Sequence, residues 1–348
     1  MSDDGRQLCV GLLRFILREG WISTEDNRIL QSTGLEICKK CRETTAEPHV
    51  YLRHELPWWL LEDKLSSHSV TSAPSRVPPI RVRAITWDFK ETNMIKFYLQ
   101  ILEHVHWPPG LKQLTFGHDF NQSVERVLWP EGLQQLTFGF RFNQAVDKVI
   151  WPAQLQHLTF GYCFSHSLAE VVWPARLQQL TFEGSIDEPV NKVVWPPGLK
   201  CLTFGHGFDQ LLDEVVWPAG LQQLTFGQCF DQPLVRVMWP TALKQLTFDD
   251  LFDQPIVNVV WPAGLEILTF GNHFEQPVNG VMWPAGLRQL RFGNSFNQSL
   301  DEVVWPKGLQ QLTFGYRFNQ PLDKVMWPAG LQQLTFGWEF NQALKRVE

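Results

Sequence analysis

Near the N-terminus, two cysteines and two histidines stand close enough together to bind a metal. Cys38 and Cys41 are separated by two residues, and His49 and His54 follow. Two thiolates and two imidazoles are a ligand set that Zn²⁺ accepts in a tetrahedral site. The gap between the two pairs is shorter than in a typical zinc finger. The pattern leaves open a zinc site or two structural cysteines at the end of a helix, and it favours the second.

Other side chains capable of catalysis are dispersed along the chain. The 10 His residues are not spaced as a ligand set, and nothing in the sequence orients a Ser-His-Asp triad. The segment GRQLCVG contains no phosphate-binding loop. We therefore expect no enzyme activity and no cofactor.

Composition and charge limit the classes of partner. The formal net charge is -6, so the chain lacks the basic field of a nucleic-acid-binding protein. No run of 18 apolar residues is present, which argues against a membrane span. Arg14 and Arg18 interrupt the N-terminal apolar run, and 6 Cys in 348 residues are not a disulfide scaffold. We expect a cytoplasmic or nuclear protein.

A repeat of 22 residues dominates the sequence, and it must position the residues that bind a partner. Trp-Pro recurs at this interval from Trp107 to Trp327, and the consensus is W-P-x-x-L-x-x-L-T-F-G-x-x-F-N-Q-P-L-x-x-V-V. A fixed period in this range is typical of a solenoid, in which each unit buries its core against its neighbours. The sequence predicts a mainly β, leucine-rich-repeat-like solenoid of about eleven coils.

Each coil can be interpreted from its alternation of apolar residues. In LQQLTFG, Leu136 and Phe138 are predicted to point inward and Thr137 outward, as in a strand. Gly139 ends that strand, and Phe142 is the next inward residue.

The second half of the coil is predicted from its polar and β-branched residues. The Asn or Asp that follows the second Phe is expected to bond the backbone of the neighbouring coil, and PLxxVVW favours a second short strand. The Trp column is either buried at each corner or an exposed aromatic ridge, and burial is the expectation.

These motifs resemble the FNIP repeat family, a 22-residue variant of leucine-rich repeats. The resemblance rests on L-T-F-G and F-N-Q-P-L, and it covers residues 105–348. The pattern departs from the consensus at 182–190 (FEGSIDEPV) and at 248–252 (FDDLF). The resemblance implies protein–protein interaction rather than catalysis.

Residues 1–62 lack the repeat and are predicted to form a small α-helical module, because apolar residues recur at helical spacing. The segment from Leu12 to Glu43 is similar to the middle and end of an F-box. That likeness implies docking of a Skp-type adaptor of a cullin ubiquitin ligase, through Leu12, Leu13, Ile16, Leu17, Trp21, Ile29 and Leu30. Residues 63–104 are predicted to be a linker with a cap strand at 80–87.

Specificity is expected where the repeat varies, because repeated positions cannot distinguish partners. The most variable slots follow the strand-ending Gly and are rich in aromatic and Arg residues, as interface anchors are. Arg291 also interrupts a rank of Thr residues that otherwise face solvent. The predicted partner-binding residues are His118, Asp119, Phe140, Arg141, Tyr162, His206, His273, Arg291, Tyr316, Arg317, Trp338 and Glu339.

Two functions are compatible with these features. The first is a substrate receptor of a ubiquitin ligase, with the solenoid holding the target. The second is a structural subunit or assembly scaffold with no ubiquitin link. Because the last coil ends in LKRVE without a polar cap, an end-to-end homodimer through that coil is a further expectation.

Overall fold

A computed structural model describes residues 35–37, 49–53, 84–88, 107 and 110–343 of the chain. For the first three of these segments the description is of the backbone, with the side chain of Thr86 added. The chain forms two compact units, Met1–Gly161 and Tyr162–Glu348.

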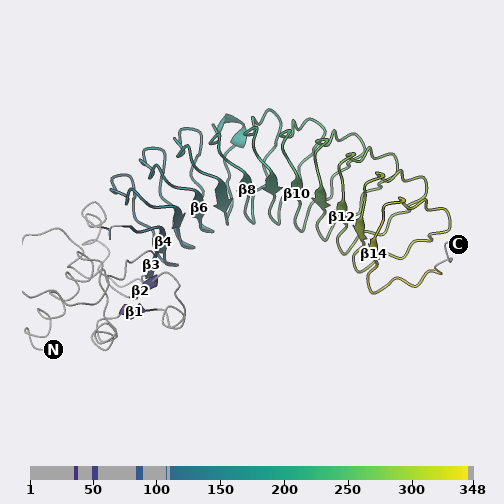
Figure 1. The fold of residues 1–348 in the computed structure, drawn as a ribbon, viewed down its shortest axis with the longest axis horizontal. Coiled ribbons are helices and arrows are strands. Elements are labelled where there is room, and N and C mark those ends of the chain that lie inside the picture. The colour runs from purple at the N-terminus through teal and green to yellow at the C-terminus, as the bar shows by residue number, and fades with distance from the viewer. Residues whose placement is uncertain (1–34, 38–48, 54–83, 89–106, 108–109, 344–348) are drawn as a thin grey trace, which may run out of the picture. The chain divides into compact units, whose positions relative to one another are not determined.

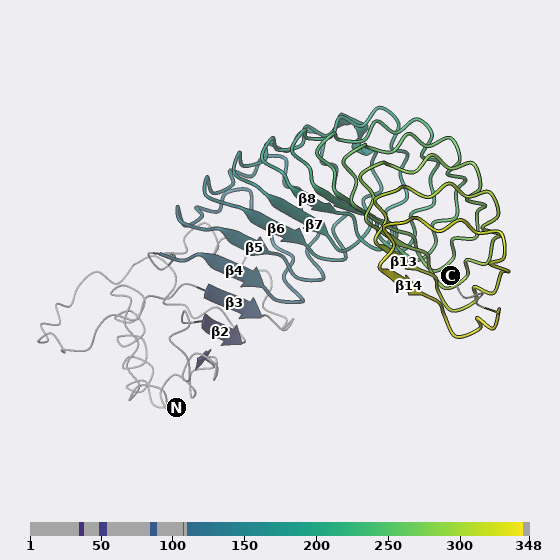
Figure 2. The same ribbon diagram turned by 45° about the vertical axis from the view of Figure 1, so that its right-hand side comes forward.

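The first unit contains a sheet in which strands pair in the order of the sequence (Figures 1 and 2). β1 pairs antiparallel with β2, and every later pairing from β2 to β6 is parallel. The strands are β1 (Leu35–Ile37), β2 (His49–Arg53), β3 (Ala84–Asp88), β4 (Gln113–Phe116), β5 (Gln135–Thr137) and β6 (His157–Phe160).

The second unit repeats one parallel strand per coil. Equivalent residues lie opposite each other, so that Leu224 pairs with Leu246 and Thr225 with Thr247. The strands are β7 (Gln179–Phe182), β8 (Cys201–Thr203), β9 (Gln223–Thr225), β10 (Gln245–Thr247), β11 (Ile267–Thr269), β12 (Gln289–Arg291), β13 (Gln311–Thr313) and β14 (Gln333–Thr335). The predicted leucine-rich-repeat-like solenoid is confirmed.

Alternation along each strand produces the core. In β5, Leu136 is buried while Gln135 and Thr137 on either side are half-buried, and the next residue, Phe138, is buried. This is the inward Leu and Phe, outward Thr arrangement that the sequence predicts. Among the described residues, none of the polar or charged ones is buried, so apolar contacts alone fill the interior.

Aromatic columns explain why the second unit curves with its strands on the inner side (Figure 1). Neighbouring parallel strands lie about 4.8 Å apart. Stacked aromatic rings need more room than this. The ring centroids lie 5.5 Å apart for Phe226 and Phe248, 6.1 Å for Phe230 and Phe252, and 6.3 Å for Trp239 and Trp261. The coils are therefore wedged apart away from the sheet.

Close approach of the backbones after each strand explains the repeated Gly. A Cβ at Gly139 would lie 1.9 Å from the carbonyl oxygen of Gly117, and one at Gly293 would lie 1.8 Å from that of Gly271. No side chain fits at such a distance. Two coils carry Glu183 and Asp249 at this position instead, and these are the coils where the sequence departs from the consensus.

A ladder of Asn and Asp side chains ties successive coils together, as the sequence predicts. The Asn143 amide donates to Asn121 Oδ1 at 2.8 Å, and the Asp253 amide donates to Asp231 Oδ1 at 2.9 Å. The Asn319 amide donates to Asn297 Oδ1 at the same distance. Each such bond pairs a backbone N–H donor in a turn of one coil with a side-chain oxygen acceptor in the preceding coil.

Most of the Trp column is buried, as the sequence predicts, and the rest of it is half-buried; the half-buried members are Trp107, Trp129, Trp239 and Trp327. Trp151, Trp195 and Trp305 are 6–7% exposed. Their indole nitrogens are inaccessible to solvent and have no hydrogen-bond partner. The column thus stabilises the coils by apolar packing, at the cost of unpaired N–H groups.

Two local predictions were wrong, and one was confirmed. Leu35 and Ile37 belong to the segment 1–62 that was predicted to be helical, but they lie in β1, because backbone pairing with β2 outweighs a short apolar pattern. PLxxVVW forms turns rather than a second strand, with one turn of 3-10 helix at Val190–Lys192. The cap strand predicted at 80–87 is present as β3 and pairs with β4.

The other N-terminal predictions concern residues outside the described part of the chain. They include the proposed domain boundaries at 62 and 104 and the helices of the F-box-like module. The adaptor-binding residues Leu12, Leu13, Ile16, Leu17, Trp21, Ile29 and Leu30 also lie there. No described residue tests these predictions.

Candidate functional site

Most predicted partner-binding residues stand in the turn that follows each strand. Phe140 is 41% exposed, Tyr316 48% and Trp338 84%, so large aromatic side chains face solvent there. The second residue of the turn is fixed by its backbone: the amides of Arg141 and Arg317 donate to the carbonyls of His118 and Asn294 in the preceding coils. The scaffold is thus rigid where the sequence varies.

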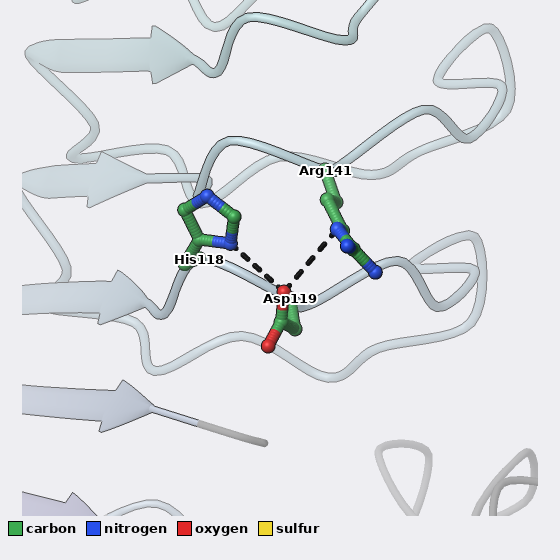
Figure 3. Close-up of polar contacts among 3 residues, drawn as sticks. All are labelled: His118, Asp119 and Arg141. Carbon is green, nitrogen blue, oxygen red and sulfur yellow. Dashed lines mark hydrogen bonds and ion pairs between the residues drawn. The ribbon is translucent and has the colours of Figure 1, made fainter. Parts of the chain in front are cut away.

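In the first unit, four predicted residues form one cluster, which we call the His118 cluster; Figure 3 shows its three polar members, His118, Asp119 and Arg141. Asp119 Oδ1 lies 2.8 Å from His118 Nδ1 and 3.3 Å from Arg141 Nε. The rings of His118 and Phe140 stack with centroids 4.8 Å apart. The charges of this cluster are therefore satisfied within the chain.

In the second unit, the turns and the exposed side of the sheet enclose a groove of about 470 Å³, which we call the Arg291 groove. It spans the coils of β10 to β14. Its lining is Thr247, Phe248, Asp249, Thr269, Phe270, Gly271, Asn272, Arg291, Phe292, Gly293, Asn294, Thr313, Phe314, Gly315, Tyr316, Gly337 and Trp338. The structure thus brings together Arg291, Tyr316 and Trp338, three residues that the sequence singled out separately.

Arg291 is the only cationic residue of this lining. It stands opposite Thr269 on one side and Thr313 on the other, so it replaces one member of the Thr rank without changing the register. Its side chain is exposed, and among the described residues no carboxylate forms an ion pair with it.

Amide side chains around the groove occupy the variable slots after the strands, but they were not among the predicted partner-binding residues. Asn272 donates through Nδ2 to Asp250 Oδ1, and Gln228 Nε2 donates to Asp250 Oδ2 at 2.9 Å. The Tyr316 amide lies 3.4 Å from Asn294 Oδ1. The departure from the consensus at 248–252 was the available signal, since it introduces Asp249 at the groove and Asp250 beside it.

The remaining predicted residues do not join either site. Tyr162 and His206 lie near each other in the second unit, with ring centroids 5.8 Å apart. His273 and Glu339 are exposed, and Arg317 is as well, but none of the three lines the groove.

A second exposed surface lies one residue before each Trp. Among the described residues, the side chains of this slot are 70–84% exposed. We call it the aliphatic rank. In the second unit it consists of Val172, Val194, Val216, Met238, Val260, Met282, Val304 and Met326, and in the first it includes Leu128 and Ile150.

Two of the described groups have pKa values shifted by burial. Burial lowers the pKa of His157 and raises the pKa of the Cys201 thiol, as expected for groups that favour the neutral form. No group of three or more His, Cys, Asp or Glu in this part of the chain could hold a metal ion. Cys38, Cys41 and His54 lie outside it, and for His49 only the backbone is described.

Within the described part of the chain, no helix has the length and hydrophobicity of a membrane-spanning segment.

Parallel one-strand coils with a columnar apolar core define a repeat protein with a leucine-rich-repeat-like solenoid fold. Four segments of the chain match the FNIP Repeat family, at residues 98–141, 230–273, 274–317 and 318–347. The chain therefore contains FNIP repeats, which confirms the resemblance seen in its sequence.

Two solved structures are similar to this chain. One is described as the crystal structure of CroV588, a circular LRR protein; it shares 36% identity and a TM-score of 0.66, over 75% of this chain and 41% of that one. This chain thus spans about two fifths of that protein's length. The other is a leucine-rich repeat protein from Bacteroides ovatus ATCC 8483, with 10% identity over 75% of this chain and 74% of that one and a TM-score of 0.20. None of the curated proteins matches the sequence.

Proposed function

We propose that this chain is a non-enzymatic scaffold that binds a protein partner through the turns that follow its strands. The observation that carries the proposal is the Arg291 groove, where exposed aromatic residues and an unpaired Arg are held on a rigid repeated frame. Aromatic residues and Arg are the side chains most enriched at binding hot spots. Repeat solenoids commonly present such extended surfaces to partners.

The repeated residues support this division of labour. Their apolar side chains are buried in the core, and their amides and carboxylates are bonded between coils, as Asn121 and Asp231 are. They build the frame, and the turn residues remain available for recognition.

Within this function, the finer proposal is a substrate receptor of a cullin-type ubiquitin ligase. It rests on the F-box-like sequence before the repeats, which would dock a Skp-type adaptor while the solenoid holds the target. The alternative is a structural subunit of a larger assembly with no ubiquitin link. A cytoplasmic or nuclear location, which fluorescence imaging of the tagged chain would test, suits both.

An end-to-end homodimer is the second candidate for the partner. Sedimentation of the purified chain at several concentrations would separate monomer from dimer.

The experiment that tests the main proposal is affinity purification of the tagged chain from its own cells. The full chain is compared with a triple variant, Arg291→Thr, Tyr316→Asn and Trp338→Asn, whose replacements occur naturally at equivalent positions of other coils. Loss of a stoichiometric partner with the triple variant supports the proposal, and an unchanged set of partners contradicts it.

A parallel sample lacking residues 1–62 addresses the ligase. Recovery of a Skp-type adaptor and a cullin with the full chain, and their loss from the truncated chain, supports the receptor. Absence of both from the full chain, with a stable partner still recovered, favours the structural subunit.

A further inference from the structure

The charge of Arg291 is not paired by any carboxylate of the groove lining. Arg291 lies on β12, and the only acidic residue of the lining, Asp249, belongs to the turn after β10, two coils away. The other nearby carboxylate, Asp250, is already bonded by Gln228 and Asn272. A guanidinium presents a fork of donors that matches a carboxylate. We therefore expect the ligand to supply a carboxylate that pairs with Arg291.

Further along the groove the lining becomes aromatic. Tyr316 stands in the coil after Arg291, and Trp338 in the coil after that, and both are exposed. Two coils correspond to about 10 Å, a distance that an extended peptide covers in about three residues. In a bound extended peptide, an apolar or aromatic residue about three positions from an acidic residue would lie against the rings of Tyr316 and Trp338.

The groove's floor suits a peptide backbone rather than a nucleic acid. Thr269 and Thr313 flank Arg291 with half-buried side chains, and the amides of Asn272 and Asn294 line the same groove. Hydroxyl and amide groups donate and accept hydrogen bonds, as a peptide backbone requires. One cation in a chain of net charge -6 does not attract a polyanion.

We propose that the Arg291 groove binds an extended peptide segment of a protein partner, in which an Asp or Glu pairs with Arg291 and an apolar residue about three positions away packs on Tyr316 and Trp338. The inference rests on the proposed protein-binding function and adds the site and the chemistry of the partner segment. The His118 cluster is excluded as an equivalent site, because Arg141 is already paired with Asp119.

The test begins with selection of random dodecapeptides, displayed on phage, against the immobilised full chain. The same library is selected against Arg291→Thr, which restores the Thr found opposite it in β11 and β13 and so preserves the fold. We expect wild-type selection to enrich peptides with an acidic residue and an apolar one about three positions apart. Selection against Arg291→Thr should lose the acidic preference.

Affinity of a synthetic peptide from the wild-type selection is then measured by fluorescence anisotropy. Arg291→Thr should weaken binding about tenfold, as expected for loss of a charge-assisted pair, and Trp338→Asn should weaken it comparably. Arg288→Gln is the matched control: it removes one positive charge from the same coil, outside the groove lining, and Gln is native at this position in other coils. It should change affinity less than twofold at 0.15 M salt, because screening is strong over about 8 Å.

The outcomes separate the two proposals. An acidic preference that persists with Arg291→Thr, or failure to enrich any peptide, overturns the peptide groove. A stoichiometric partner that is still lost with the triple turn variant would then leave the protein-binding function standing, with a folded surface as the ligand.

Discussion

The His118 cluster lies in the turn after a strand, and the Arg291 groove is formed by equivalent turns together with the exposed side of their strands. The cluster neutralises its own charges, and the groove leaves Arg291 without an ion pair among the described residues. In the cluster, Asp119 is held between His118 and Arg141 of the next coil (Figure 3). In the groove, Arg291 forms no ion pair with a carboxylate of the described residues. Identical backbones thus yield a self-contained surface in one place and a surface that awaits a charged ligand in another.

The frame beneath both regions should be equally intolerant of a side chain after the strand. Gly139→Ala and Gly293→Ala each place a Cβ within 2 Å of a carbonyl oxygen, so we expect each to lower the free energy of unfolding by about 3 kcal/mol. Urea denaturation followed by circular dichroism measures the loss.

Gly264→Ala provides the control, since its Cβ would meet no atom closer than 3.7 Å. It should be nearly neutral. Equal stability of Gly293→Ala and Gly264→Ala would show that the coils do not pack as closely as described.

The Asn ladder is intact beside the His118 cluster and broken near the groove. Asn121 Oδ1 accepts from the Asn143 amide, but Glu275 at the equivalent position accepts no bond from the Asn297 amide. Glu275→Asn should complete the ladder and raise the free energy of unfolding by about 1 kcal/mol. Asn297→Ala, which removes bonds to Asn319 and Gln320, should lower it by a similar amount. A denaturation midpoint that falls for Glu275→Asn would contradict this.

Removing a charge should affect stability in the cluster and binding in the groove. Asp119→Asn is expected to lower the free energy of unfolding by less than about 1 kcal/mol, because the pair is solvent-exposed. Arg291→Thr should change it by less than about 0.5 kcal/mol, since no pair is lost and Thr suits a strand. Thermal denaturation of both variants measures these changes in stability. A larger loss of stability for Arg291→Thr than for Asp119→Asn would mean that Arg291 is structural.

A cross-coil pair outside both regions gives the smallest effect. Lys244 Nζ lies 2.9 Å from Glu266 Oε1, and this hydrogen bond, followed by the charges of Lys244 and Arg288, lowers the pKa of Glu266 from its ordinary value of 4.5. A lowered pKa in the folded state adds stability above the unfolded value and loses it as pH falls through the folded value. Lys244→Gln should raise the pKa of Glu266 in an NMR titration; an unchanged pKa would show that the pair does not form in solution.

The sequence predicted the fold well because each coil repeats the same physical constraints. Leu136, Phe138 and Phe142 are inward by alternation alone, and eleven copies remove the ambiguity that one copy would have. It failed for β1, where three residues take their structure from pairing with β2 rather than from their own pattern.

The site was only partly predictable. Variability pointed to Tyr316 and Trp338, and the broken Thr rank pointed to Arg291. Their convergence in one groove depends on three successive coils, and so does the neutralisation of Asp119 by Arg141 from the next coil. Which charged residues remain unpaired is a property of neighbouring coils that a single repeat does not reveal.

Hydroxyl-radical footprinting of the full chain, free and bound to the partner recovered by affinity purification, tests the central claim most directly. The account predicts reduced oxidation of Tyr316 and Trp338, with Phe140 of the His118 cluster unchanged. Met238 and Met282, which are 70% and 75% exposed on the aliphatic rank, report the competing surface. Protection of these methionines with Tyr316 and Trp338 unchanged would contradict recognition through the Arg291 groove.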